Sequence, residues 1–255
     1  MLLTIDVGNT QTVVGLLDGE DAAGHWRLTT DAEETEDELR ISLRALFALD
    51  GFAEGDVSGV ALSSVVPALT GGYRTVAEQI TDGPVVVVGP GVKTGMPILI
   101  DNPREVGADR IANAVAARGR YGMPAVVVDF GTSTNFDVVG ADGEYLGGVI
   151  APGLHIATNA LISGTAALRR VEYVPPRSPI GKGTVEAIQS GALYGHAGLV
   201  DGIMERVATE LGGDVIRIAT GGLASTIVPH CSSVSTIDEF LTLEGLRRIY
   251  ELNTT

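Results

Sequence analysis

The amino-acid sequence predicts an α/β protein made of two similar βββαβαβ lobes with a cleft between them. The main observation is an internal repeat. The apolar run that begins at Leu2 ends in Asp6-Val7-Gly8 and is followed by a second strand, and residues 125–139 repeat this order in the second half. Each half then continues with alternating helical and apolar segments. Such a repeat indicates duplicated lobes that each open on an Asp-x-Gly turn.

The first half shows its elements in order. Apolar runs and turn signals predict strands at 2–7, 11–17, 25–29, 57–65 and 85–88. The sequence Thr35-Glu36-Asp37-Glu38 has the form of a capping box, and Gly51 stands where the helix that follows should end. A second helix is expected at 68–80.

The second half repeats this pattern. It has an apolar run that ends in Asp-x-Gly at 125–132, predicted strands at 135–139 and 215–219, and a helix expected at 185–211. Another helix is expected at 111–121, before the second copy begins. Gly122 and Pro124 punctuate the chain just before the second copy begins. We therefore predict an N-terminal lobe at 1–120 and a C-terminal lobe at 121–255.

Composition narrows the classes of function. An apolar content of 45% with 19% charged residues argues against disorder. The formal charge of −15 disfavours nucleic acid and anionic membranes as partners. No apolar run approaches the ~18 residues of a membrane span. The one cysteine, Cys231, cannot form an internal disulfide. These features predict a soluble, cytoplasmic protein.

The segment Asp6-Val7-Gly8-Asn9-Thr10 has the residue types of a hairpin phosphate loop. Gly8 lets the backbone approach a phosphate, Thr10 adds a hydroxyl, and Asp6 can orient Mg²⁺ and its waters. An ordinary hairpin in which Asp6 caps the turn would look the same.

The segment Asp129-Phe130-Gly131-Thr132 allows the same two interpretations. Two copies facing one cleft favour phosphate binding, because one loop can hold each end of a triphosphate.

The segment Gly107-Ala108-Asp109-Arg110 stands just before a helical pattern. Asp109 could be an N-cap, or it could be a general base that accepts a hydroxyl proton during phosphoryl transfer. In the second case Arg110 could bind an acidic acceptor.

These motifs, in this order and spacing, resemble those of type III pantothenate kinases, a family of the actin-like (ribonuclease H-like) superfold. The resemblance extends over the whole chain. Further matching segments are Asp101-Asn102-Pro103, Gly147–Gly153, Thr220-Gly221-Gly222 and Leu243-Glu244-Gly245-Leu246.

The resemblance implies a function: ATP-dependent phosphorylation of pantothenate to 4′-phosphopantothenate, the first step of coenzyme A biosynthesis. It also implies Mg²⁺ and a monovalent cation, K⁺ or NH₄⁺, as cofactors.

The resemblance also assigns residues. Asp109 would be catalytic, Asp6 would hold Mg²⁺, and Asp129 would hold the monovalent cation. ATP would be bound by Asp6, Val7, Gly8, Asn9, Thr10, Gln11, Thr12, Val13, Gly131 and Thr132. Pantothenate would be bound by Ile100, Gly107, Ala108, Asp109, Arg110 and Thr184.

Four glycines follow one face of the predicted helix 185–211, namely Gly191, Gly195, Gly198 and Gly202. Glycine costs about 1 kcal/mol per helix position relative to alanine, so their spacing indicates close packing on that face. The packing partner could lie in the same chain. The resemblance instead favours a homodimer, with Thr184 reaching the neighbouring subunit's site.

Two further functions are compatible with the sequence. A kinase of the same superfold could act on another small acceptor, such as a sugar, acetate or polyphosphate. A relative without activity could bind nucleotide as a regulator. A panel of phosphoryl acceptors would distinguish a kinase for another acceptor from a pantothenate kinase. Nucleotide binding without turnover would support the regulator.

Overall fold

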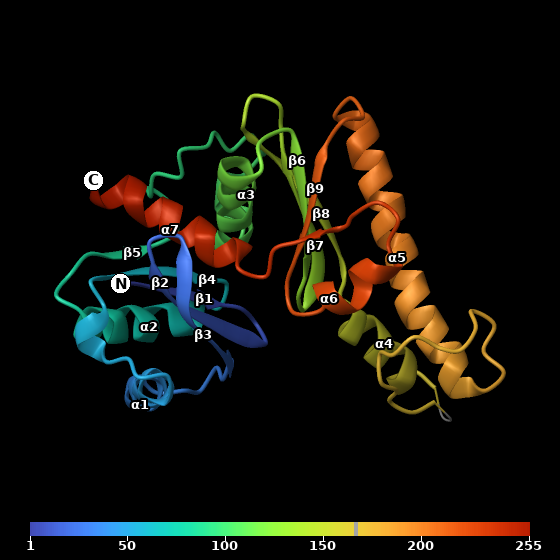
Figure 1. Cartoon of the computed structure of the whole chain (residues 1–255), viewed down its shortest axis with the longest axis horizontal. Coiled ribbons are helices and arrows are strands. Elements are labelled where there is room, and N and C mark those ends of the chain that lie inside the picture. Colours follow the sequence, from blue (N-terminus) through green and yellow to red (C-terminus); the bar gives the residue numbers. More distant parts are fainter. Residues whose placement is uncertain (166–167) are drawn as a thin grey trace. The chain divides into compact units, whose positions relative to one another are not determined.

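The computed structural model describes residues 1–165 and 168–255, which fold into two compact units (Figure 1). The first unit contains residues 1–116 together with 241–255, and the second contains 117–240. Each unit is built on one five-stranded mixed sheet. No helix in the described part of the chain is both long enough and apolar enough to cross a membrane.

The sheet of the first unit has the strand order β3-β2-β1-β4-β5. Its strands are β1 (Leu2–Val7), β2 (Gln11–Asp18), β3 (Asp21–Thr29), β4 (Gly59–Ser64) and β5 (Val85–Val87). The first three strands are antiparallel neighbours, whereas β4 runs parallel to both β1 and β5.

Helices complete the first unit. They are α1 (Glu36–Leu49), α2 (Pro67–Ile80), α3 (Ala108–Arg120) and α7 (Leu241–Thr254), with 3₁₀ turns η1 (Glu54–Asp56) and η2 (Pro103–Glu105). The boundary between the two units falls within α3. Apolar side chains of β1, β4, α1 and α2 form one core, which includes Leu3, Ile5, Leu43, Leu62 and Tyr73.

The second unit repeats the arrangement, with the strand order β10-β9-β6-β7-β8. Its strands are β6 (Ala125–Phe130), β7 (Ser133–Val139), β8 (Tyr145–Pro152), β9 (Ile216–Thr220) and β10 (Thr236–Ile237). Its helices are α4 (Leu154–Ser163), α5 (Thr184–Glu210) and α6 (Ala224–Ile227), followed by the 3₁₀ turn η3 (Val228–His230).

The two sheets confirm the predicted duplication. Read from its other edge, the second order is β8-β7-β6-β9-β10, which matches β3-β2-β1-β4-β5 strand for strand. The first strand of each unit pairs antiparallel with the next strand and parallel with the fourth. Each half therefore has the predicted βββαβαβ order, with α4 and α5 together filling the first helical position in the second.

Two local signals are confirmed at α1. The Glu38 N–H donates to Thr35 Oγ1 at 3.3 Å, and the Thr35 N–H donates to a Glu38 carboxylate oxygen at 3.0 Å. These two bonds complete the capping box. Gly51, just past the helix, has a φ of 81°, which favours glycine.

The C-terminal helix α7 corrects the predicted division into 1–120 and 121–255. This helix packs against β1 and β4, so residues 241–255 belong to the first unit. Glycines make room for it, because a Cβ added at Gly15 or Gly59 would collide with Leu243 or Tyr250. Burial of Leu243 and Leu246 stabilises this packing.

Candidate functional site

The first Asp-x-Gly turn joins β1 to β2. The Gly8 N–H donates to the Gln11 carbonyl at 3.1 Å, which closes the loop. A Cβ added at Gly8 would lie only 2.8 Å from that carbonyl oxygen, so the loop requires glycine there. Asn9 and Thr10 are exposed at its tip. The loop thus presents backbone and small polar groups to solvent, which suits phosphate binding.

The carboxylate of Asp6 is held at the edge of this loop. Asp6 pairs in register with Ser63 on the parallel strand β4. The Ser63 hydroxyl donates to Asp6 Oδ1 at 2.6 Å. The side chain is therefore tied to the neighbouring strand, next to the loop. An oriented carboxylate in this position can bind a hard cation.

The predicted ATP-binding segment Asp6–Val13 contains both exposed and buried residues. Val7 and Thr12 are fully buried. The Thr12 hydroxyl lies 2.9 Å from that of Thr30 and accepts a bond from Tyr73 at 3.3 Å. Thr12 therefore supports the loop from within the sheet, while Gln11 is exposed at its end.

Asp109 lies in the first turn of α3, at its second residue. Its Oδ1 accepts the backbone N–H of Arg110 at 2.8 Å. A Cβ added at Gly107 would collide with this same carboxylate oxygen. Asp109 is thus not the N-cap, because it lies inside the helix. Its carboxylate does accept an N–H of the first turn.

The surroundings of Asp109 increase its affinity for a proton. Burial raises the pKa of this carboxyl above its usual value, and the N–H and positive charge of Arg110 lower it only in part. A carboxylate with increased proton affinity is suited to accept a proton from a substrate hydroxyl.

Val65 lies between the first Asp-x-Gly loop and the Gly107–Arg110 segment. Its N–H donates to the Val7 carbonyl at 3.0 Å, beside the first loop. A Cβ added at Gly107 would lie 3.3 Å from Val65 Cγ1, so the start of α3 packs on the same residue. The first loop and the Asp109 segment therefore adjoin within one unit. Ile100 is partly exposed in the connection between β5 and η2.

The second Asp-x-Gly turn joins β6 to β7. The Gly131 N–H donates to the Ser133 carbonyl at 3.0 Å, which makes this loop one residue shorter than the first. Gly153, at the end of β8, packs against it, because a Cβ there would collide with the Thr132 carbonyl oxygen. The loop carries the predicted residues Gly131 and Thr132.

Asp129 occupies the position that corresponds to Asp6. It pairs in register with Thr220 on β9, as Asp6 does with Ser63 on β4. Gly221 follows with a φ of 89°, and a Cβ there would collide with Asp129 Oδ1. The backbone after β9 thus packs directly against this carboxylate.

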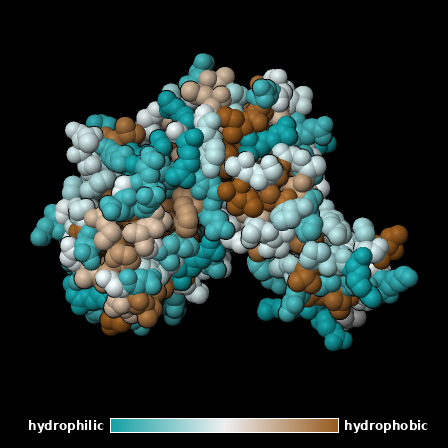
Figure 2. All heavy atoms as spheres, in the orientation of Figure 1, coloured by the Kyte–Doolittle hydropathy of each residue, from teal (hydrophilic) through white to brown (hydrophobic). Residues whose placement is uncertain are grey.

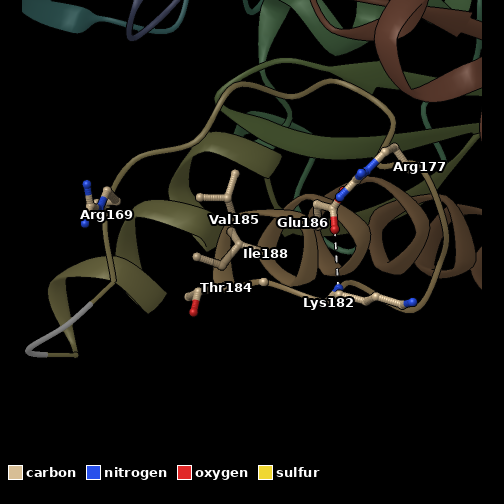
Figure 3. A pocket seen from close by; sticks show the side chains of 8 residues that line it. Arg169, Arg177, Lys182, Thr184, Val185, Glu186 and Ile188 are labelled. Carbon is tan, nitrogen blue, oxygen red and sulfur yellow. Dashed lines mark hydrogen bonds and ion pairs between the residues drawn. The ribbon is translucent and has the colours of Figure 1, made fainter.

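Thr184 is the first residue of α5 and lines a pocket of about 680 Å³ in the second unit (Figure 3). Three basic residues, Arg169, Arg177 and Lys182, line the same pocket. The Arg177 guanidinium bonds Glu186 at 2.6 Å, and the backbone N–H of Lys182 donates to the same carboxylate. The pocket therefore combines basic residues and Glu186 with an exposed threonine.

The glycine face of α5 is open within the chain. A Cβ added at Gly191, Gly195 or Gly198 would meet no atom of residues 1–165 and 168–255 within 4 Å. Packing inside the same chain, one of the two predicted explanations, is therefore wrong for Gly191, Gly195 and Gly198 among the described residues. A Cβ at Gly202 would lie 3.3 Å from the Arg206 side chain of the same helix.

Comparison with known proteins decides the family. A type III pantothenate kinase family model matches residues 2–206. A type III pantothenate kinase of Frankia alni is 55% identical over 254 residues, which cover 99% of this chain and 100% of the relative. The chain belongs to the type III pantothenate kinase family.

Solved structures agree on the fold. A Campylobacter jejuni protein described as a conserved Baf-family transcriptional activator has a TM-score of 0.61 at 18% identity, with 98% of each chain covered. An inorganic polyphosphate/ATP-glucomannokinase from an Arthrobacter strain has a TM-score of 0.50 at 16% identity, covering 98% of this chain and 97% of the other. At these identities the likeness shows the actin-like fold alone.

Two residues around the pantothenate kinase family motifs were not predicted from the sequence. His196 of α5 lies 2.8 Å from the Thr134 hydroxyl at the end of the second loop. Val65 joins the first loop to α3. An apolar residue or a single histidine carries no motif, so only the folded chain identifies them.

Proposed function

We propose that this protein transfers the γ-phosphoryl group of ATP to the primary hydroxyl of pantothenate, giving 4′-phosphopantothenate in the first step of coenzyme A biosynthesis. The observation that carries the proposal is the position of Asp109. In a chain of this family, a carboxylate with raised pKa adjoins the Gly8–Gln11 loop through Val65.

The reaction needs one proton acceptor and a cradle for phosphate. The pantothenate oxygen would bond to the γ-phosphorus, and the bond from that phosphorus to the bridging oxygen of ADP would break. The hydroxyl proton would pass to the Asp109 carboxylate. Backbone amides of the Gly8–Gln11 loop would bind ATP phosphates, and Arg110 would bind the pantothenate carboxylate.

The remaining substrate contacts follow the family assignment. Gly131 and Thr132 of the second loop would contact ATP, while Gly107, Ala108 and Ile100 would contact pantothenate. Support comes from the loop geometry in the second unit, where Gly131 closes the turn with a backbone bond of 3.0 Å.

The carboxylates present fit the cations that the family implies. Asp6 would hold Mg²⁺, and Asp129 would hold K⁺ or NH₄⁺, because oxygen ligands suit these hard cations. The described residues contain no group of three or more His, Cys, Asp or Glu placed to bind a metal, so substrate oxygens and water would complete each shell. When bound, the cations would offset the charge of the triphosphate.

A homodimer is part of the proposal. The open glycine face of α5 allows close approach of a second copy. Hydrophobic residues also gather over part of the second unit on the face shown in Figure 2. Ile150 of β8 is 67% exposed. In the dimer, Thr184 would reach the partner's pantothenate site.

The cellular setting follows from the substrates. Pantothenate and ATP are small cytoplasmic metabolites, and the net charge of −15 disfavours nucleic acid or anionic membrane as a partner. We therefore infer a cytoplasmic enzyme.

The test is ADP release from Mg·ATP with pantothenate, measured with and without potassium. A panel of sugars, acetate and polyphosphate serves as the acceptor control. Pantothenate-dependent, potassium-stimulated release is expected. Equal release with another acceptor would contradict the substrate assignment, and nucleotide binding without release would contradict the kinase assignment.

A further inference from the structure

A buried polar contact joins α5 to the second loop. His196 on α5 is 6% exposed, and its Nε2 lies 2.8 Å from Oγ1 of Thr134, which is 1% exposed. Either atom can be the donor. A buried pair of this kind is costly to break, because the partner left behind has no water to replace the lost bond.

Thr134 stands at the point where the second loop returns to the sheet. It pairs in register with Phe130, so these two residues flank Gly131–Ser133 on either side. The Phe130 ring also lies close to His196, with 6.2 Å between ring centroids. His196 therefore contacts both residues from which the loop projects.

The ring of His196 is suited to a fixed role. Burial lowers its pKa below the usual value, so the imidazole is neutral at neutral pH. A neutral ring nitrogen can hold one hydrogen bond to the hydroxyl without bringing a charge into the core. Its side chain is anchored in a 27-residue helix, which gives the contact a rigid base.

We propose that His196 is a positioning residue for the nucleotide: through Thr134 and Phe130, it fixes the backbone of the Gly131–Ser133 loop for ATP. This inference rests on the proposed function, in which that loop binds ATP. His196 itself touches no reacting group in the proposal. Loss of the contact should therefore weaken nucleotide binding and leave pantothenate binding unchanged.

The experiment measures the Kd for a non-hydrolysable Mg·ATP analogue by calorimetry, together with KM for ATP and for pantothenate. Thr134→Val removes the hydroxyl, and His196→Phe removes the ring nitrogens in a similar volume. We expect each of these two variants to raise the nucleotide Kd and the KM for ATP about tenfold. The reason is that the remaining buried partner loses its hydrogen bond. The double variant should be no worse than either single one. His196→Gln, which retains a polar group near Nε2, should recover most of the affinity.

Tyr145→Phe is the matched control. The Tyr145 hydroxyl donates to Asp137 Oδ1 of β7 at 3.0 Å, and both residues are buried, but they lie farther along the strand from the loop. This variant should lower thermal stability without changing the nucleotide Kd. If His196→Phe fails to fold, Thr134→Val decides.

An unchanged Kd in Thr134→Val, or an equal loss in Tyr145→Phe, would overturn the proposal. If the wild type binds nucleotide but does not phosphorylate pantothenate, the proposed function fails. The Kd values still decide the role of His196 in that case.

Discussion

Helices α3 and α7 each place a carboxylate in the first turn, but the two carboxylates have opposite surroundings. Glu244 of α7 is 3% exposed and bonds Arg247 at 2.8 and 2.9 Å and Arg248 at 2.5 Å. Asp109 of α3 accepts the backbone N–H of Arg110.

The pKa values diverge accordingly. Burial tends to raise the pKa of Glu244, but the bonds from Arg247 and Arg248 bring it below the usual value. At Asp109 burial dominates, and the pKa is raised. The first turn of a helix therefore holds a carboxylate with a lowered pKa in one case and one with a raised pKa in the other. The bonds from Arg247 and Arg248 make this difference, which fits the proton-accepting role proposed for Asp109.

The largest expected effect is on catalysis at Asp109. Asp109→Asn should lower kcat by about 10²- to 10⁴-fold, the usual contribution of a positioned general base. An acid whose pKa is higher in the folded than in the unfolded state reduces stability at neutral pH, so the neutral amide should raise the melting temperature. Steady-state kinetics and a thermal melt measure both. Asp82→Asn, at an exposed aspartate of the same unit, is the control and should change neither.

The second prediction concerns stability at Glu244. Glu244→Gln should destabilise the protein by ~2 kcal/mol, because Arg247 and Arg248 lose their buried carboxylate partner and, among the described residues, Arg247 keeps only the more exposed Glu251 and Glu20. The kcat of the folded enzyme should be retained. Denaturant unfolding and activity at low temperature test this pair of outcomes. A large loss of kcat with unchanged stability would reverse the two assigned roles.

Gly107→Ala sharpens the comparison without changing a charge. The added Cβ would collide with Asp109 Oδ1 and displace the carboxylate. Since small misplacements of a reacting group can cost up to about 100-fold in rate, kcat should fall about 10- to 100-fold. Gly71→Ala in α2 is the control, because a Cβ there meets no described atom within 4 Å. Equal activity in the two variants would show that the carboxylate position is not critical.

The smallest expected effect is on the pH dependence of stability. The lowered pKa of Glu244 contributes stability that is present above its unfolded pKa and lost as the pH falls through the folded pKa. Asp109 has the opposite sign, and it reduces stability above its unfolded pKa. Melts from pH 7 to about pH 3 should therefore show a smaller acid loss in Glu244→Gln and a larger one in Asp109→Asn than in the wild type.

Local patterns made much of the fold predictable. The capping box at Thr35 and Glu38 and the Asp-x-Gly repeat at Asp6 and Asp129 depend on residues close in sequence. The duplicated strand order then followed from the repeat. Each of these signals is a short motif of neighbouring residues, so a single sequence is enough to reveal it.

Contacts between distant residues were not predictable in this way. The return of α7 to the first unit depends on Gly15 and Gly59, which lie more than two hundred and about one hundred and ninety residues before the side chains they accommodate. His196 and Thr134 are 62 residues apart. The raised pKa of Asp109 depends on its burial, and that burial exists only in the folded chain.

The most direct test of the central claim is mass-spectrometric detection of 4′-phosphopantothenate formed from Mg·ATP and pantothenate. Wild type, Asp109→Asn and Glu244→Gln would be compared at matched nucleotide occupancy. The account predicts product from the wild type and from folded Glu244→Gln, with a rate at least about 100-fold lower in Asp109→Asn. Product formed at the wild-type rate by Asp109→Asn would contradict it.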